Sequence, residues 1–202
     1  MLLRLRISLP DRPGGLGHVA RALGVLGADI LQVTVLEREA GRAVDDFVVS
    51  WPGQTTPEAV LQRLSAVQGA RVEAVWPTRR VPGSAQDYEL LLQVTSDPAR
   101  GLATLVDALP VLCGAEWAAA LTPAEVRHRS VSAPEEIKIP GPWPVRPQAT
   151  VEGDTRLMLI PEGETTVVVG RTQGPPYHRV ELERAASLVA VVTKLAAGRA
   201  GG

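Results

Sequence analysis

The chain has 202 residues, which is enough for one large domain or two small ones. Hydrophobic residues make up 45% and charged residues 21%, so a disordered, collagenous or coiled-coil protein is poorly supported. The 21 basic and 22 acidic residues give a net charge of -1, which lacks the basic surplus that nucleic-acid binding requires. No apolar run approaches the roughly 18 residues that span a bilayer, and nothing near Met1 resembles a signal peptide. We therefore expect a cytoplasmic protein whose partners are neither nucleic acid nor membrane.

Hydrophobic periodicity and turn residues predict six elements in the first part of the chain. In order, they are a strand over 3–9, a helix over 16–26, strands over 31–35 and 44–51 joined as a hairpin, a helix from Thr56–Pro57, and a strand over 70–76. This order predicts a ferredoxin-like βαββαβ domain over residues 1–77, with a four-stranded antiparallel sheet and both helices on one face. The whole chain is then an α+β protein.

The segment 78–87 contains proline, glycine and serine and is predicted to be a linker. Beyond it, we expect a second α+β domain over residues 88–198. Its predicted elements are a strand or helix start over 88–94, a helix over 102–109 that ends near Pro110, a strand over 117–121, a hairpin of strands 157–160 and 165–170, and a helix over 178–197. Five prolines between 134 and 147 predict an ordered loop or a mobile arm.

An internal comparison leaves a second interpretation of this half open. A shift of 86 residues without gaps places Asp11 on Asp97, and Gly15-Leu16 on Gly101-Leu102. The match fails where Pro13 faces Ala99, and it does not extend to the C-terminal hairpin and helix. A degenerate duplication of the first domain is therefore the minority interpretation.

The turn after the first strand carries the most informative local chemistry. Pro13 fixes φ, while Gly14 and Gly15 let backbone N–H groups approach a ligand closely. The turn opens a helix, whose N-terminal end has unpaired N–H donors and partial positive charge, so a carboxylate can dock there. The alternative is that these residues only make a tight connection between strand and helix.

The segment Asp11-Arg12-Pro13-Gly14-Gly15-Leu16, together with Gly27-Ala28-Asp29-Ile30 at the start of the second strand, resembles an ACT domain. The resemblance covers residues 1–77. It implies a small-molecule sensor that commonly binds amino acids at an interface between two copies.

The resemblance implies a ligand site made of the turn and the start of the second strand. Its candidate residues are Asp11, Pro13, Gly14, Gly15, Leu16, Asp29 and Ile30. The two carboxylates suit the ammonium group of an amino acid, and the backbone N–H groups of the turn suit its carboxylate. In the alternative interpretation, Asp11 caps the turn and Asp29 caps the helix exit.

The second half resembles the C-terminal part of a GAF domain, another sensor module. The resemblance rests on Gly170-Arg171, the segment Gly174-Pro175-Pro176-Tyr177-His178, and the helix that opens with Glu181-Leu182-Glu183-Arg184. It implies a central antiparallel sheet between helices on one side and a ligand pocket on the other, and it transfers no ligand residue.

The last helix is apolar around most of its circumference between Ala185 and Val192. Such a helix is buried on more than one side. A two-fold homodimer would bury it, and so would full burial within one chain.

Signals for catalysis and cofactors are weak. His18, His128 and His178 lie far apart without metal-ligand spacing, and the single cysteine, Cys113, is expected to be a small buried hydrophobe. No phosphate-binding or dinucleotide motif occurs, and no nucleophile has a base beside it. Trp143, between two prolines, can cover a pocket, dock on a partner or pack on its own domain.

We therefore expect a non-enzymatic regulatory protein without metal or cofactor, dimeric, that binds an amino acid or a similar metabolite. Ligand binding would shift the population of domain arrangements. The alternative is an interaction module, in which the first sheet only dimerises and the proline-rich segment docks a partner.

Overall fold

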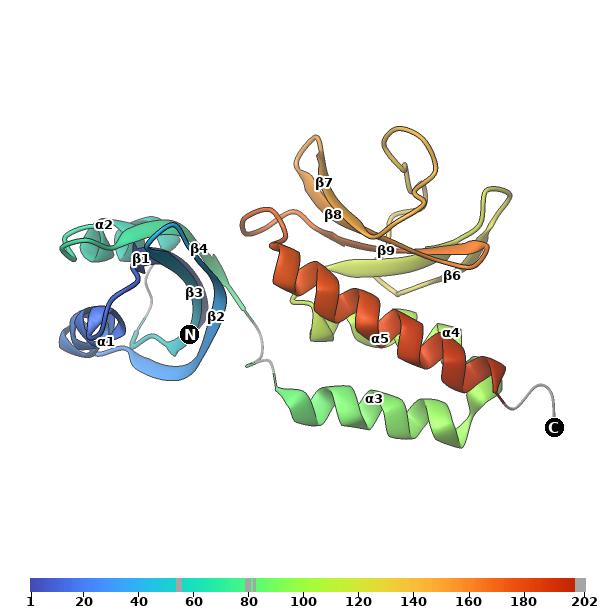
Figure 1. Ribbon diagram of the computed structural model, residues 1–202, viewed down its shortest axis with the longest axis horizontal. Helices are drawn as coiled ribbons and strands as arrows, with labels where there is room; N and C mark the ends of the chain where they lie inside the picture. The colour runs from blue at the N-terminus through green and yellow to red at the C-terminus, as the bar shows by residue number, and fades with distance from the viewer. Residues whose placement is uncertain (54–55, 79–80, 82, 199–202) are drawn as a thin grey trace. The chain divides into compact units, whose positions relative to one another are not determined.

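The computed structural model describes residues 1–53, 56–78, 81 and 83–198. Contacts within the chain define two compact units. The first comprises Met1–Val81 with Gln173–Pro175, and the second comprises Pro82–Thr172 with Pro176–Gly202. The fold is α+β, with one antiparallel sheet in each unit (Figure 1).

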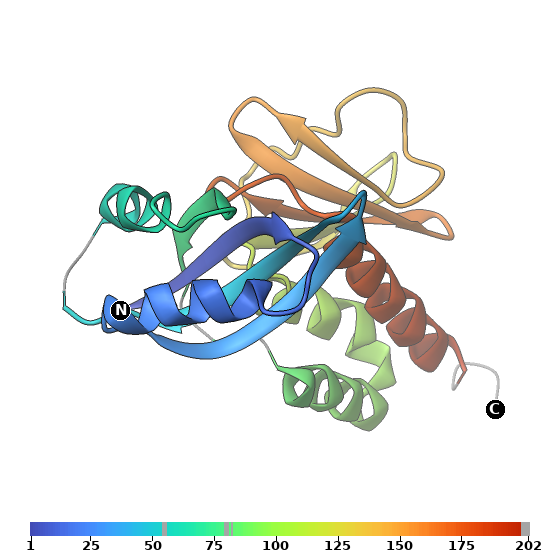
Figure 2. The ribbon, with the colours of Figure 1, turned by 60° about the vertical axis from the view of Figure 1, so that its left-hand side comes forward.

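The first unit has the order βαββαβ and confirms the predicted ferredoxin-like architecture. Its elements are β1 (Leu2–Pro10), α1 (Gly15–Val25), β2 (Asp29–Glu39), β3 (Arg42–Ser50), α2 (Pro57–Leu64) and β4 (Arg71–Pro77). The sheet has the order β2-β3-β1-β4, and every pair in it is antiparallel. In Figure 2 the blue helix α1 lies along the strands of this sheet.

The core of the first unit lies between the sheet and its two helices. Alternate residues of β1 contribute side chains to this core from the sheet, because a strand turns every second side chain to the same face. Helix α1 adds Val19 and Leu23, and α2 adds Val60 and Leu64. The members of this core from the sheet and its ends are Leu3, Leu5, Ile7, Leu9, Ala28, Phe47, Val49 and Trp51.

The hairpin between β2 and β3 fixes which residues of these two strands share a face. Its two turn residues, Ala40 and Gly41, both have positive φ, 50° and 75°, which is the turn geometry that matches the twist of the flanking strands. The resulting register places Asp45 of β3 opposite Val35 of β2. The separate pairing of β3 with β1 places Asp45 opposite Ile7, on the face that carries the core.

Within its described residues, the second unit contains three longer helices and five strands. They are α3 (Ser84–Ser96), a short 3-10 turn η1 (Pro98–Arg100), α4 (Gly101–Leu112), β5 (Trp117–Leu121), β6 (Val126–Arg129), β7 (Gln148–Glu152), β8 (Thr155–Glu162), β9 (Thr165–Arg171) and α5 (Arg179–Ala197). The sheet has the order β6-β5-β9-β8-β7 and is antiparallel.

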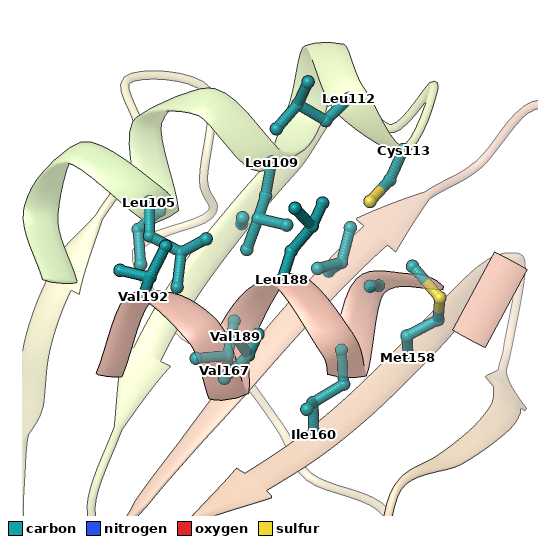
Figure 3. Packing of buried hydrophobic residues seen from close by; sticks show 14 of the residues in the cluster. Leu105, Leu109, Leu112, Cys113, Met158, Ile160, Val167, Leu188, Val189 and Val192 are labelled. Atoms are coloured by element: carbon teal, nitrogen blue, oxygen red, sulfur yellow. The ribbon is translucent and has the colours of Figure 1, made fainter. Parts of the chain in front are cut away.

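One face of this second sheet packs against α4 and α5, and α3 packs against these two helices. Figure 3 shows α4 and α5 meeting over the sheet, with Leu109 and Leu188 pointing toward each other. Cys113 is buried at the end of α4, as expected for a small hydrophobe. The buried residues of α5 lie against its own unit, which accounts for its apolar circumference without a second copy.

Several expectations for the second half need correction. The structure makes 84–96 a helix, which takes in Ser84–Asp87 of the expected linker; residues 79, 80 and 82 of that linker lie outside the described residues. Helix α4 continues through Pro110 to Leu112. A proline lacks the backbone N–H that would donate to the carbonyl one turn back, and its ring clashes with that carbonyl. Helix α4 tolerates Pro110 because it lies close to the helix end.

The duplication of the first domain is wrong. The 86-residue shift would place strand β1 on helix α3, and the second unit begins with two helices and continues with five strands. The two units therefore have different topologies.

Candidate functional site

The turn between β1 and α1 presents an uncapped helix end. Gly14 precedes α1 with φ of 87°, a left-handed conformation that favours glycine. No side chain of the described residues caps the helix, and the first turn of α1 contains no acidic residue. A Cβ on Gly15 would lie 3.0 Å from Leu9 Cδ1 and 3.1 Å from the Pro10 carbonyl oxygen, so the chain approaches itself closely here. The Gly15 N–H donates to the Arg12 carbonyl oxygen at 3.1 Å, and the next N–H groups, those of Leu16 and Gly17, can donate to an anionic group from outside.

The predicted residues of this turn lie together at one end of the sheet. Asp11, Pro13, Gly14 and Leu16 are exposed and Gly15 is half-buried. The Asp11 N–H donates to the Gly41 carbonyl oxygen at 2.9 Å, which ties the turn to the β2–β3 hairpin.

The Asp11 carboxylate pairs with Arg38 of β2, and the two groups approach to 2.7 Å. Hydrogen bonding to Asp11 raises the pKa of Arg38 above its ordinary value. The Arg38 side chain is 66% exposed and that of Asp11 is 29% exposed. Asp11 therefore holds a surface cation, and it does not cap α1.

Asp29 and Ile30 lie at the opposite end of the same sheet. Asp29 is exposed and pairs in register with Ser50, whereas Ile30 is half-buried against the core. Strand β2 has 11 residues, which span about 35 Å at about 3.3 Å per residue. One chain therefore does not bring these two residues to the turn that contains Asp11.

Asp45, a residue that the sequence analysis did not single out, lies near the turn on the core face of the sheet. It is 1% exposed, and neither carboxylate oxygen has a hydrogen-bond partner within the part of the chain that the structure describes. Burial raises its pKa, the Asp11 and Asp46 carboxylates raise it further, and Arg38 lowers it. The signal was present in the sequence, because Ala43, Asp45, Phe47 and Val49 alternate along β3.

A small hollow beside the turn lies between the first residues of α1 and the residues before β4. Its lining includes Arg12, Gly15, His18 and Gly69. It has room for about one water molecule. This hollow is too small for an amino acid, so a ligand at the turn needs another surface or a rearrangement.

Part of the proline-rich segment covers the face of the second sheet that lies opposite its helices. Residues of the proline-rich segment, Ala133, Ile137 and Ile139, pack on a cluster that contains Trp117 and Leu159. This segment is therefore ordered against its own domain in that part, and it occupies the face where the GAF resemblance implies a pocket. Further along the segment, Trp143 is 37% exposed and Val145 is 93% exposed.

The polar groups near the start of α5 bind one another. Arg171 is buried, lies 3.2 Å from Glu181, and stacks 3.9 Å over the ring of Tyr177. His178 and Glu181 form a capping box for α5. Burial raises the pKa of Cys113 to about 12, which keeps the thiol protonated and unreactive. These contacts support a structural role for the cluster.

The described residues contain neither a metal-binding cluster nor a membrane-spanning helix. Across residues 1–53, 56–78, 81 and 83–198, no group of three or more histidine, cysteine, aspartate or glutamate side chains is placed to hold a metal ion. In the same residues, no helix is both long and apolar enough to cross a membrane.

Comparisons with known proteins identify no family. No protein-family model matches the chain, and no curated protein matches it. Solved structures that resemble it include a formyltetrahydrofolate deformylase from Pseudomonas putida KT2440, 19% identical with a TM-score of 0.32, which covers 48% of this chain and 38% of that one. The chain thus spans well under half of the deformylase.

Two other solved structures match over most of their length. The regulatory subunit of aspartate kinase from Thermus thermophilus is 14% identical with a TM-score of 0.32 and covers 95% of this chain and 91% of that one. An unknown protein from Galdieria sulphuraria is 11% identical with a TM-score of 0.33, and the match covers 96% of this chain and 91% of that one. These values are too low to assign a function to this chain.

Proposed function

We propose that the protein is a non-catalytic regulator that binds a small molecule, most simply an amino acid, at the turn between β1 and α1. The observation that carries the proposal is the uncapped N-terminus of α1 behind Gly14, because its N–H groups and helix dipole suit a carboxylate. The resemblance of residues 1–77 to an ACT domain supports the same assignment. Catalysis is not part of the proposal.

The proposal includes a second copy of the chain, which would complete the site. Strand β2 is at the edge of the sheet, and Leu31, Val33 and Val35 on it are between 40% and 47% exposed. Antiparallel pairing of two β2 strands about Thr34, the midpoint of the strand, would bring Asp29 and Ile30 of one copy to the turn of the other. A homodimer of this form would unite the predicted site residues.

A thermal-shift screen against the twenty amino acids tests the proposal, because a ligand that binds only the folded state raises the melting temperature. We expect one amino acid or a related group to give a dose-dependent shift. Gly14→Val strains the positive φ of the turn, and Asp29→Ala removes the second part of the site, so both variants should lose the shift.

Gly24→Ala is the matched control. It lies at the other end of α1, and an added Cβ meets no atom within 4 Å. The shift should persist in this variant. A shift that persists in Gly14→Val and Asp29→Ala as well would remove the site assignment, and no shift with any amino acid would remove the amino-acid sensor.

The second candidate function is a partner-docking module. It is favoured by the exposed Trp143 and Val145 in the proline-rich segment. Deletion of 134–147 is a poor test, because Ile137 and Ile139 pack on the second sheet. The paired substitutions Trp143→Ser and Val145→Ser leave that packing in place, and loss of a cross-linked partner in these variants would support docking.

A further inference from the structure

The first unit contains a buried carboxylate that has no hydrogen-bond partner among the described residues. Asp45 is 1% exposed, and both of its oxygens lack a hydrogen-bond partner in the described parts of the chain. A buried charge without a partner is strongly unfavourable in a folded protein unless it is neutralised or bound. A cationic group beside Asp45 would offset this cost.

The charges that act on Asp45 already have other partners. Asp46 is on the opposite face of β3, where it binds Arg4 and Arg6. Asp11 is held by Arg38, whose guanidinium is at the surface. Among the described residues, Asp45 therefore has no hydrogen-bonded cation of its own, and one additional positive charge would pair with its ionised form.

The position of Asp45 relative to the turn indicates the shape of a ligand that would supply the positive charge. The turn offers N–H groups at the surface, whereas Asp45 is buried on the core face, between Ile7 of β1 and Val35 of β2. A molecule that reaches both needs a carboxylate at one end, a cation at the other, and an apolar stem between them. Methylene groups suit the aliphatic side chains on either side of Asp45.

We infer that the proposed site selects an amino acid with a cationic side chain, with its carboxylate on the N–H groups of the first turn of α1 and its ammonium or guanidinium on Asp45. This inference rests on the proposed function, because it assigns the chemistry of the same site. A side chain of the arginine or lysine type has the stem and the net charge of +1 that the site requires. A zwitterion with a neutral side chain would leave Asp45 unpaired.

Binding would also connect the ligand to the edge of the sheet. Asp45 is nearly fully buried, so the ligand reaches it only as neighbouring side chains move. Its register partner on one side is Val35 of β2, and Arg38 of the same strand is close enough to affect its ionisation. Strand β2 is the edge proposed for pairing between copies, so the ligand would act on that pairing directly.

Isothermal titration calorimetry on the full chain tests the inference with four probes: L-arginine, L-lysine, L-citrulline and L-leucine. Citrulline matches arginine in shape but lacks its charge. We expect arginine or lysine to bind, and citrulline and leucine to bind at least tenfold more weakly. This comparison needs no variant, so it does not depend on how a substitution folds.

Asp45→Asn keeps the shape of the side chain and removes its charge, and it should weaken arginine or lysine binding at least tenfold. Asp154→Asn, an exposed aspartate in the second unit, is the control and should leave binding unchanged. Citrulline or leucine binding as tightly as arginine, or unchanged arginine binding in Asp45→Asn, would overturn the inference.

The two proposals fail in different ways. A neutral amino acid that binds and is lost in Gly14→Val would leave the proposed function standing and overturn the cationic ligand. No heat and no thermal shift with any of the twenty amino acids would overturn both.

Discussion

Two consecutive aspartates on β3 illustrate opposite treatments of a buried charge. Asp46 is 2% exposed and binds Arg4 at 2.6 Å and Arg6 at 2.8 Å, and both guanidinium groups lie over the ring of Trp76. Asp45 is 1% exposed and has no such partner among the described residues. Of these two aspartates on opposite faces of β3, Asp46 is therefore paired with arginines, whereas Asp45 has no hydrogen-bond partner among the described residues. A partnered charge can belong to the scaffold, whereas an unpartnered one lowers stability and calls for a functional explanation.

The largest effect should come from Asp46→Asn. The substitution leaves the buried Arg6 and the partly buried Arg4 without their carboxylate, and breaking a buried pair in this way costs about 3–5 kcal/mol of unfolding free energy. Urea denaturation followed by circular dichroism measures it. A loss below about 1 kcal/mol, the size typical of surface pairs, would show that the two faces of β3 do not differ as described.

Asp45→Asn should raise the free energy of unfolding, whereas Asp46→Asn lowers it. Its folded-state pKa is raised, chiefly by burial, so the folded chain binds the proton more tightly than the unfolded chain. Ionisation of Asp45 therefore destabilises the fold as the pH rises from about 4, the unfolded pKa, through the raised folded value. The variant should gain about 1–2 kcal/mol at pH 7, and the gain should shrink toward pH 4.

Urea denaturation at pH 4.5, 5.5 and 7 measures this trend. A loss of stability at pH 7, or a gain that does not change with pH, would contradict an unpaired ionised carboxylate. A variant that is more stable and yet loses arginine binding would separate the functional role of Asp45 from a structural one.

Arg38→Gln should change the stability of the fold least. The pair between Arg38 and Asp11 is at the surface, where solvent and salt screen the attraction between charges. We expect the urea midpoint to stay within the error of the measurement. A clear fall would show that this pair supports the turn, and the ranking of the three carboxylates would then need revision.

The first unit could be predicted largely from its sequence. Strict alternation from Leu3 to Leu9 and the turn residues before α1 are local signals, and they gave the correct order of elements. The partners of Arg6 and Asp46 could not be predicted, because 40 residues separate them along the chain. For Asp45, alternation indicates its face, but the absence of a partner depends on three-dimensional packing.

The candidate site was predicted in part for the same reason. The turn from Asp11 to Leu16 is one continuous segment, so its geometry follows from proline and glycine. Whether Asp29 meets this turn depends on how copies assemble, and a single chain places it at the other end of β2. That part of the site stays a prediction.

The second unit was harder to predict because its edge strands carry little signal. Strand β6, Val126–Arg129, is mostly exposed and polar, and β7, Gln148–Glu152, is mostly exposed as well. Hydrophobic periodicity arises because one face of an element is buried. A strand with both faces near solvent lacks this pattern and is not predicted from it. The central strands β5, β8 and β9 are buried and were predicted correctly.

The pairing of β5 with β9 has a consequence for the order in which the chain matures on the ribosome. The sheet of the first unit is complete once Pro77 is available, because β4 pairs with β1. Strand β5 ends at Leu121, but its central partner β9 begins at Thr165, a delay of several seconds at about 5–20 residues per second. During that interval the apolar strand Trp117–Leu121 has no central partner to pair with. The second unit is therefore the later to fold and the one that depends more on protection from aggregation while synthesis continues.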